Sequence, residues 1–243
     1  GARVLSVVNV VGSSVARESD DVFYTWAGPE IAVASTKAYT TQLMCMYLLA
    51  LHMGQVKGTI DDKYFETIMS QLKALPAKLE RVLEQEEHIA QIAEKIYRNN
   101  NVFFIGRGMD ASIAYEGSLK LKEISYINSF AMAAGELKHG TIALIEPGTL
   151  VIALAAQEKL YEKMLSNIQE IKARGALVIG VAKDNSDAIE KQSDMTIYIP
   201  DCMDEVSPVL EIVPLQILAY HIARLRGCNI DKPKNLAKSV TVE

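Results

Sequence analysis

Cysteine and positive charge are both scarce in this sequence. The three cysteines, Cys45, Cys202 and Cys228, are far apart and odd in number. This pattern argues against a disulfide framework and favours reduced thiols in a cytoplasmic protein. The formal net charge is −5, which speaks against a nucleic-acid surface because binding phosphate backbones needs a positive footprint. A local basic pocket for a single phosphate is still compatible with this charge.

Membrane and metal signals are also missing. No segment reaches the length of a membrane span, and the N-terminal residues lack the charged-then-apolar pattern of a signal peptide. The four histidines are scattered, and no Cys-x-x-Cys pair is present. We therefore expect no membrane association, no metal and no cofactor.

What the sequence does contain is enough apolar material for a substantial core. Its 243 residues are 49% apolar, which suits one large or two ordinary soluble domains. From residue 102 onward, apolar runs typical of buried strands alternate with helical patterns. The predicted strands are 102–105, 149–156, 176–182 and 195–199, and the later predicted helices are 157–174, 187–193 and 207–226. The alternation predicts an α/β fold, with a parallel sheet between two layers of helices.

The first hundred residues follow a similar pattern. Residues 4–11 form an apolar run that predicts a strand buried on both faces. Such a strand needs neighbours, so either later strands supply them or the chain is a fragment whose earlier strands are absent. A helix is expected at 29–52, and Gly54 to Asp62 is the candidate domain boundary. Two further helices are expected, 63–73 and 76–98, with a break at Pro76.

The most informative stretch is 115–140. Glu116, Lys120 and Glu123 are spaced i, i+4, i+7, which places them on one face of a helix. A small-residue connection follows, and then the segment 135–140 presents Glu136, Lys138 and His139 between two glycines. A carboxylate, an amine and an imidazole within mutual reach can transfer protons near neutral pH. The alternative is a solvated helix face with salt bridges and a polar loop, and the residues alone favour that alternative.

Two other features have weaker functional interpretations. Residues 106–111, Gly-Arg-Gly-Met-Asp-Ala, match a loose dinucleotide fingerprint, but the acid expected about 20 residues later is missing. We keep this turn only as a possible anion site at a helix N-terminus. The polar tail 228–243 would by default be disordered. Its Leu236, Val240 and Val242 could nevertheless dock it, and docking would deliver the Lys238 amine into a pocket.

These residues also support a family resemblance. The segments Glu116-Gly-Ser-Leu-Lys-Leu-Lys-Glu123 and Gly135-Glu-Leu-Lys-His139-Gly resemble the second sugar-isomerase (SIS) domain of the glucosamine-6-phosphate synthase family, the isomerizing glutamine–fructose-6-phosphate aminotransferases. Residues 12–20 and 27–42 look like the later half of the family's first SIS domain. The tail 234–243 is similar to the family's C-terminus and is the most specific of these matches.

The resemblance implies a role for each matching catalytic residue. Glu123 would move a proton between C1 and C2 of the opened sugar, and Lys238 would form a Schiff base with fructose 6-phosphate. His139 would assist ring opening across the interface of a homodimer. Lys120 would lie near the reacting hydroxyl groups.

Four further residues match positions that surround the sugar. Glu116 corresponds to a charged position on the catalytic helix, and Val33, Ser35 and Ala237 correspond to positions that touch the substrate. The implied fold is flavodoxin-like, with two SIS domains in tandem and the first incomplete.

The expected domains are 1–60, the later part of the first SIS domain, 61–227, the second SIS domain with its connecting helices, and 228–243, a tail at the substrate site. Neither the family's glutaminase domain nor its phosphate-binding loop is found in this sequence. We therefore expect a fragment that could be inactive alone.

The function implied is the conversion of fructose 6-phosphate and ammonia to glucosamine 6-phosphate, a step of hexosamine biosynthesis. Glutamine would be the source of the ammonia in the full-length enzyme. The alternatives are another SIS sugar-phosphate isomerase or deglycase, which would share the loop at 135–140 but not the tail, and a module that senses sugar phosphates. The presence of both Lys238 and Glu123 speaks against a sensing module, since sensing needs neither a base nor an amine.

Overall fold

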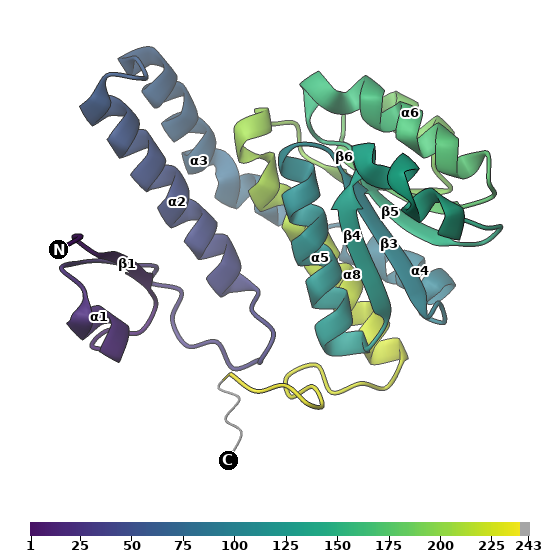
Figure 1. Ribbon diagram of the computed structural model, residues 1–243, viewed down its shortest axis with the longest axis horizontal. Helices are drawn as coiled ribbons and strands as arrows, with labels where there is room; N and C mark the ends of the chain where they lie inside the picture. The colour runs from purple at the N-terminus through teal and green to yellow at the C-terminus, as the bar shows by residue number, and fades with distance from the viewer. Residues whose placement is uncertain (239–243) are drawn as a thin grey trace. The chain divides into compact units, whose positions relative to one another are not determined.

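A computed structural model describes residues 1–238 of the chain (Figure 1). The chain divides into two compact units. Unit 1 comprises Gly1–Ser70 with the described end of the chain, Ala237 and Lys238, and unit 2 comprises Gln71–Leu236. The three cysteines are free thiols, as predicted.

Unit 2 is built on a five-stranded sheet in the order β4-β3-β5-β6-β7. Every pair of neighbouring strands is parallel, so the predicted α/β fold with a parallel sheet is confirmed. The order is that of flavodoxin-like folds, in which ligands bind beyond the carboxyl ends of the strands. The strands are β3 (Asn101–Gly106), β4 (Asn128–Ala133), β5 (Leu150–Leu154), β6 (Leu177–Lys183) and β7 (Met195–Ile199).

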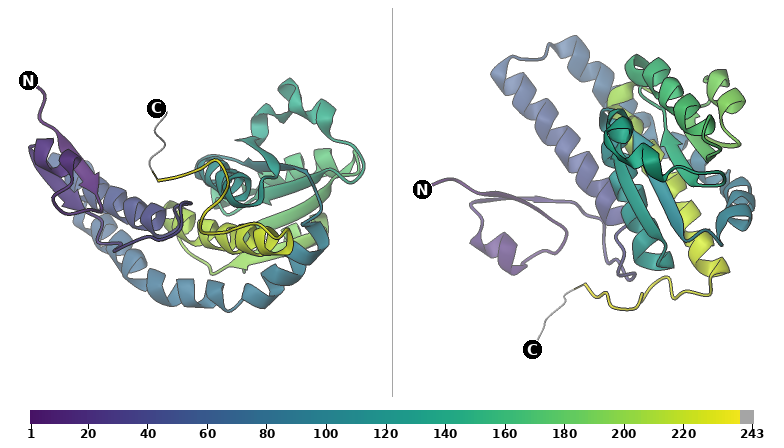
Figure 2. Two further views of the ribbon diagram at one scale, coloured as in Figure 1. Left: turned by 90° about the horizontal axis from the view of Figure 1, so that it is seen from below. Right: turned by 45° about the vertical axis from the view of Figure 1, so that its right-hand side comes forward.

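Helices cover both faces of this sheet (Figures 1 and 2). On one face, Phe103 and Ile105 of β3 belong to a core that includes buried residues of α6 (Tyr161–Lys172). On the other face, Phe104 lies beside α5 (Met109–Ser125), which packs against α8 (Ser207–Leu225). Successive side chains of a strand point to opposite faces, so β3 is apolar almost throughout. The remaining helices of this unit are α4 (Glu86–Ile96) and α7 (Asp187–Gln192), with short 3-10 turns η1 (Ala134–His139), η2 (Thr141–Leu144), η3 (Glu158–Leu160) and η4 (Asp204–Val206).

Three elements of unit 2 and its borders differ from the sequence predictions. Residues 128–133 form edge strand β4 rather than a plain connection, because pairing with β3 outweighs their weak strand propensity. Helix α3 (Asp62–Leu83) continues through Pro76, and α8 continues through Pro214. The predicted interruption at Pro76 is therefore wrong, and the helix predicted at 76–98 is instead the end of α3 followed by α4. In α8, which is largely buried, tertiary packing offsets the hydrogen bond that Pro214 removes. Pro76 lies on the exposed side of α3.

The prediction that no segment reaches the length of a membrane span is wrong. Asp204–Leu225 is long and apolar enough to pass that test, with a mean hydropathy of 1.4. Its apolar side chains pack inside unit 2, since 72% of that window is buried. A buried core helix has this composition for the same reason that a membrane helix does, because neither faces water.

Unit 1 holds a smaller sheet and the first long helix. Strand β1 (Leu5–Val8) pairs in parallel with β2 (Asp21–Tyr24), and α1 (Ser14–Glu18) connects them. The prediction of a strand buried on both faces at 4–11 is wrong for the described chain, because β1 has only one neighbour and Leu5 is exposed. Strand β2 was not predicted.

Helix α2 (Lys37–Lys57) begins later than the predicted helix at 29–52. Residues 25–36 form a loop instead. The Glu30 carboxylate explains the later start, because Oε1 accepts hydrogen bonds from Thr36 N at 2.8 Å and Ala38 N at 3.4 Å. These amides belong to the first turn of the helix and have no partner within it. Glu30 therefore satisfies the helix N-terminus from six residues upstream.

Candidate functional site

Helix α5 is fixed closely against the rest of unit 2. It begins after Gly108, whose φ of 57° a side chain would disfavour. In its middle, a Cβ at Gly117 would lie only 2.6 Å from Leu215 Cδ1, so only glycine lets α5 approach α8 this closely. Ser118 and Ser129 join α5 to β4 through a hydroxyl–hydroxyl hydrogen bond of 2.9 Å. The face that these contacts leave free is therefore held in one orientation.

The three charged residues predicted on one face of α5 do meet. Lys120 Nζ lies 2.6 Å from Glu123 Oε2 and 3.4 Å from Glu116 Oε1. The side chain of Lys120 is only 4% exposed, against 13% for Glu116 and 22% for Glu123. The prediction of salt bridges is confirmed, but the solvated face that the residues alone favoured is wrong, since the lysine is buried.

Burial also shapes the electrostatics of this cluster. Burial raises the pKa of the Glu116 carboxyl above its ordinary value, the nearby Lys120 ammonium opposes the shift, and the Glu123 carboxylate adds to it. One buried ammonium thus serves two carboxylates. Glu123 is the more exposed of the two carboxylates, although its oxygen next to Lys120, Oε2, is itself buried.

The segment after β4 is anchored through its lysine. Lys138 Nζ of η1 lies 2.7 Å from Glu170 Oε1 on α6, and this contact is the main cause that lowers the pKa of Glu170. Asn167 donates to Glu170 and accepts a hydrogen bond of 2.9 Å from Arg107 Nε. These contacts fix η1 to α6. His139 is exposed and has no hydrogen bond or ion pair among the described residues, so its imidazole is free to meet another molecule.

Unit 1 contains the residues predicted from the loop and the tail. Lys238 Nζ lies 3.9 Å from Glu30 Oε2, with side-chain exposures of 48% and 7%. Burial alone would raise the pKa of Glu30, but hydrogen bonds from the Thr36 and Ala38 amides, together with the Lys238 ammonium, hold it below its ordinary value. Glu30 is therefore a lasting negative partner for the lysine. Val33 and Ser35 are half-buried in the same loop, and Ala237 is exposed.

The structure thus assembles the predicted residues in two separate sets. Glu116, Lys120 and Glu123 meet in unit 2, and Lys238 lies in unit 1 with Val33, Ser35 and Ala237. That the two sets form one site stays a prediction. Val240 and Val242, which were expected to help dock the tail, lie outside the described residues.

Sequence reasoning missed several polar residues near these sets. Glu30 was only part of a matched segment, although a carboxylate shortly before a helix start is a recognisable N-terminal signal. Tyr126 caps the C-terminal end of α5 and accepts a hydrogen bond from Lys234 N. No sequence signal distinguishes that tyrosine, because the contact joins segments more than 100 residues apart.

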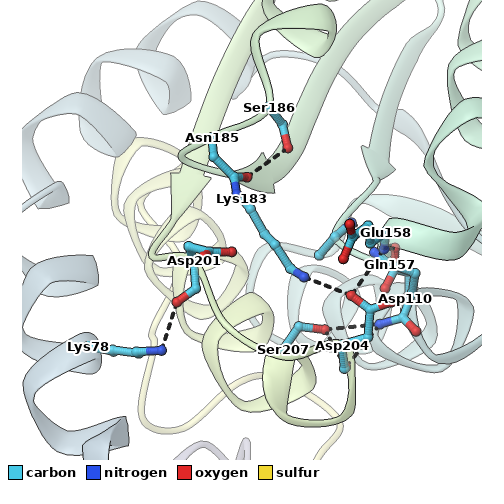
Figure 3. A network of polar contacts seen from close by, with 11 residues as sticks. Lys78, Asp110, Gln157, Glu158, Lys183, Asn185, Ser186, Asp201, Asp204 and Ser207 are labelled. Atoms are coloured by element: carbon cyan, nitrogen blue, oxygen red, sulfur yellow. Dashed lines mark hydrogen bonds and ion pairs between the residues drawn. The ribbon is translucent and has the colours of Figure 1, made fainter. Parts of the chain in front are cut away.

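A third missed group lies at the carboxyl ends of β5 and β6 (Figure 3). Lys183 Nζ is 2.7 Å from Asp204 Oδ1, and Gln157 Nε2 donates to Ser207 Oγ at 3.0 Å. Burial alone would lower the pKa of Lys183, but the pairing with Asp204 outweighs it and raises that pKa.

Asp110, in the first turn of α5, accepts hydrogen bonds from the amides of Ala156 and Gln157 at 2.9 and 3.3 Å. The group ties α5 to the loop after β5. Asp110 also places a carboxyl at the turn that we kept as an anion site, and that interpretation stays a prediction.

Together these features define an α/β protein whose parallel sheet supports a helix with an acid–amine–acid cluster. The sequence profile of the SIS domain matches residues 1–52 and 95–226. The chain belongs to the SIS-domain family.

Known relatives are similar over the whole chain. The isomerizing glutamine–fructose-6-phosphate aminotransferase of Caldanaerobacter subterraneus is 59% identical over 243 residues, which are 100% of this chain and 40% of that protein. The C-terminal domain of glucosamine-fructose-6-phosphate aminotransferase from Francisella tularensis has a TM-score of 0.89 and 38% identity, covering 94% of this chain and 65% of that one. A glucosamine-6-phosphate deaminase from Thermotoga maritima has a TM-score of 0.73 and 26% identity, covering 99% of this chain and 67% of that one. The chain spans about 40% of the length of the aminotransferases it matches.

Proposed function

We propose that this chain is the isomerase part of a glucosamine-6-phosphate synthase, which makes glucosamine 6-phosphate from fructose 6-phosphate and ammonia. The relatives at 59% and 54% identity are isomerizing glutamine–fructose-6-phosphate aminotransferases. The similarity extends over 100% of the chain, so it includes every residue to which we assign a role. Because the chain spans only part of those proteins, the complete activity belongs to the proposal.

The observation that supports the proposal most is the cluster on α5. An enediol mechanism needs one base that reaches both C1 and C2 of an open-chain ketose. Glu123 is a partly accessible carboxylate on a helix held by close packing, and its contact with Lys120 Nζ is only 2.6 Å. In the proposed mechanism Glu123 takes a proton from C1 and returns it to C2. Lys120 and Glu116 hold Glu123 in place and bind the sugar hydroxyl groups.

Lys238 supplies the amine for the covalent step. The neutral amine attacks the C2 carbonyl of fructose 6-phosphate, and loss of water gives an imine, which is more easily activated than the ketone. Ammonia then replaces the lysine at C2, and the free lysine leaves. Transfer of the C1 proton to C2 converts the new imine into an aldehyde at C1 and an amine at C2. Before substrate binds, the contact with Glu30 at 3.9 Å holds the lysine near the loop at 25–36.

The remaining parts of the proposal concern the surroundings of the site. Val33, Ser35 and Ala237 touch the sugar, and the exposed imidazole of His139 opens the ring of substrate bound to a second copy in a homodimer. In the full-length protein a glutaminase domain of the same chain supplies ammonia, and the protein works in the cytoplasm. The domain boundaries proposed are 1–60, 61–227 and 228–243.

The test uses the full-length protein with glutamine and with free ammonia. Glu123→Gln keeps the size of the side chain but removes the base, so product formation should fall by at least about 100-fold. Lys238→Arg should abolish the adduct that borohydride traps with fructose 6-phosphate, because a guanidinium does not form the imine. Glu94→Gln and Lys232→Arg are matched controls, since both side chains are exposed, and both should behave as wild type. Undiminished glucosamine 6-phosphate formation in either test variant would reject the role of that residue.

The structural similarity to the Thermotoga deaminase favours a second candidate, release of ammonia from glucosamine 6-phosphate. Both reactions use a proton transfer between C1 and C2, so the same Glu123 would serve either. The two candidates differ in net direction. Rapid consumption of glucosamine 6-phosphate by the wild-type protein, with no synthesis from fructose 6-phosphate and ammonia, would favour the deaminase.

A further inference from the structure

The C-terminal end of α5 holds the chain that follows α8. Tyr126 caps the helix, and its hydroxyl accepts a hydrogen bond of 2.8 Å from Lys234 N. The ammonium of Lys234 lies 4.3 Å from the centre of the Tyr126 ring. One side chain therefore contacts Lys234 twice, through its hydroxyl group and through its ring face. Both residues belong to unit 2.

The segment before Lys234 has a defined path. Asn229 Oδ1 accepts hydrogen bonds from Asp231 N at 3.2 Å and Lys232 N at 2.8 Å, which makes a local turn. Pro233 follows and is buried. Proline has a fixed φ, so the amide of Lys234 is presented to Tyr126 by a stiff segment. These contacts tie down a segment that would by default be disordered.

The backbone of Tyr126 indicates that its side chain is needed. Its φ is +60°, a left-handed conformation. Glycine is the usual residue at such a helix end because it adopts this conformation freely, whereas a bulky side chain there is strained. Here the strained residue is the one whose ring and hydroxyl hold the tail.

We propose, on the basis of the proposed function, that Tyr126 is a positioning residue that ties the helix of the proposed base to the segment of the proposed amine. Tyr126 follows Glu123 by three residues, and Lys238 follows Lys234 by four residues. Four residues of extended chain span at most about 14 Å. The covalent chain keeps the Cα atom of Lys238 within that distance of Lys234, and the contact with Tyr126 fixes Lys234 at the C-terminal end of α5. A tethered group in such a volume has a far higher effective concentration than a free tail.

The two contacts of Tyr126 can be removed separately. Tyr126→Phe removes the hydroxyl group and keeps the ring, and Lys234→Gln removes the cation while its backbone amide stays. Tyr126→Asn removes both contacts with a residue that tolerates the left-handed conformation. Tyr220→Phe is the control, because Tyr220 lies on α8 and its ring contacts Arg224 rather than the tail.

The experiment measures how fast borohydride traps fructose 6-phosphate on Lys238 in the full-length protein. We expect a fall of about 3- to 10-fold for Tyr126→Phe, the effect of one hydrogen bond. For Lys234→Gln we expect the trapping rate to fall about 2- to 5-fold. For Tyr126→Asn we expect a fall near the product of the falls in the two single-contact variants. The kcat for glucosamine 6-phosphate should fall in parallel, with little change in KM, because the variants alter the delivery of the amine and not the binding of sugar. Lys234→Arg keeps a cation over the ring and should restore the wild-type rate.

Two results separate failure of this inference from failure of the proposed function. If the wild-type protein forms no adduct at Lys238, the proposed function falls, and the role of Tyr126 falls with it. If wild type forms the adduct and both Tyr126 variants form it at the same rate, only the positioning role is rejected. The positioning role is also rejected if the variants lose adduct only in proportion to a lower melting temperature, and if Lys234→Arg forms adduct as slowly as Lys234→Gln.

Discussion

At the scale of single residues, α5 is associated with two acidic groups of different kinds. Glu123 has an ammonium partner on the same helix. Asp110 and Glu211 are almost fully buried, and neither forms an ion pair with a cation within residues 1–238. Asp110 Oδ1 and both oxygens of Glu211 have no hydrogen-bond donor among the described residues. Since a protonated carboxyl group can donate to a carboxylate, one shared proton gives a hydrogen bond between one oxygen of each residue.

The environment of this pair favours that proton. Burial raises the pKa of Asp110 to about 6, although the amides of Ala156 and Gln157 oppose the shift. Burial and the Asp110 carboxylate raise the pKa of Glu211 well above its ordinary value, and the nearby Ser207 hydroxyl and Lys183 ammonium do not outweigh them. At pH values between the unfolded-state and folded-state pKa values, the folded chain therefore keeps a proton that the unfolded chain releases.

The first stability prediction follows from this proton. The folded-state pKa values lie above the unfolded values, so the free energy of unfolding should fall as pH rises from about 4.5 through the folded-state values. Glu211→Gln replaces the protonated acid by an amide that can donate to Asp110 at any pH. Between pH 5 and pH 8 the free energy of unfolding should fall by roughly 1–3 kcal/mol more in wild type than in Glu211→Gln. Urea unfolding at several pH values measures both slopes.

The control for this prediction is Glu94→Gln, which removes an exposed carboxylate on α4. It should leave the pH dependence as in wild type. Equal slopes for Glu211→Gln and wild type would show that both buried acids are ionised in the folded protein, and the shared proton would have to be abandoned.

At the scale of elements, the position of the candidate cluster depends on how closely α5 and α8 approach. A methyl group at position 117 would lie 2.6 Å from Leu215 Cδ1 and 3.2 Å from Phe104 Cε1. Leu215 and Phe104 are buried, so neither can move aside freely. Overpacking of this kind costs about 1–3 kcal/mol, whereas alanine in a helix interior gains up to about 1 kcal/mol over glycine.

We therefore expect Gly117→Ala to lower the free energy of unfolding by roughly 1–2 kcal/mol. The matched control is Ser112→Ala, on the exposed side of the same helix, which should be neutral or slightly stabilising. Activity should fall in Gly117→Ala as well, because a displaced α5 moves Glu123. If the glycine variant is as stable as the control, the helices have room to separate, and close packing does not explain the fixed cluster.

The comparison of these elements with the sequence shows what local patterns can predict. Strands such as β3 and β5 are apolar on both faces, so their sequence alone indicates burial between two helix layers. Strand β4 was missed because its pairing with β3 depends on a segment about 27 residues away. Helix α3 was divided at Pro76 because a local rule was applied where packing decides.

The candidate site was predictable to a similar degree. The i, i+4, i+7 spacing was sufficient to place Glu116, Lys120 and Glu123 together, because helix geometry fixes which side chains are neighbours. Burial of Lys120 was not predictable, since it depends on what packs around the helix. Tyr126 and Glu211 could not be assigned roles for the same reason, because their partners are distant in sequence or on other elements. For Glu30 the helix start was a recognisable signal, but its contact with Lys238 was not predictable.

At the scale of the whole molecule, the proposed site needs parts from different units and from a second copy. Lys238 and the loop with Val33 and Ser35 belong to unit 1, and the α5 cluster belongs to unit 2. His139 is exposed and has no partner within the described part of the chain. In the proposed arrangement this imidazole completes the site of a second copy, and homodimers are the commonest assembly that brings two copies together.

Mixing two inactive variants tests this arrangement. Glu123→Gln removes the base from its own site, and His139→Ala removes the imidazole from the neighbour's site. In a mixed dimer of the two, one site contains both defects and the other contains none. Equal amounts of the variants, unfolded and refolded together, should therefore recover about a quarter of wild-type activity, because half of the dimers are mixed and each has one intact site. If His139 instead serves its own chain, each site in the mixed dimer has one defect. Mixing would then recover no activity, and the proposed exchange of residues between subunits would be rejected.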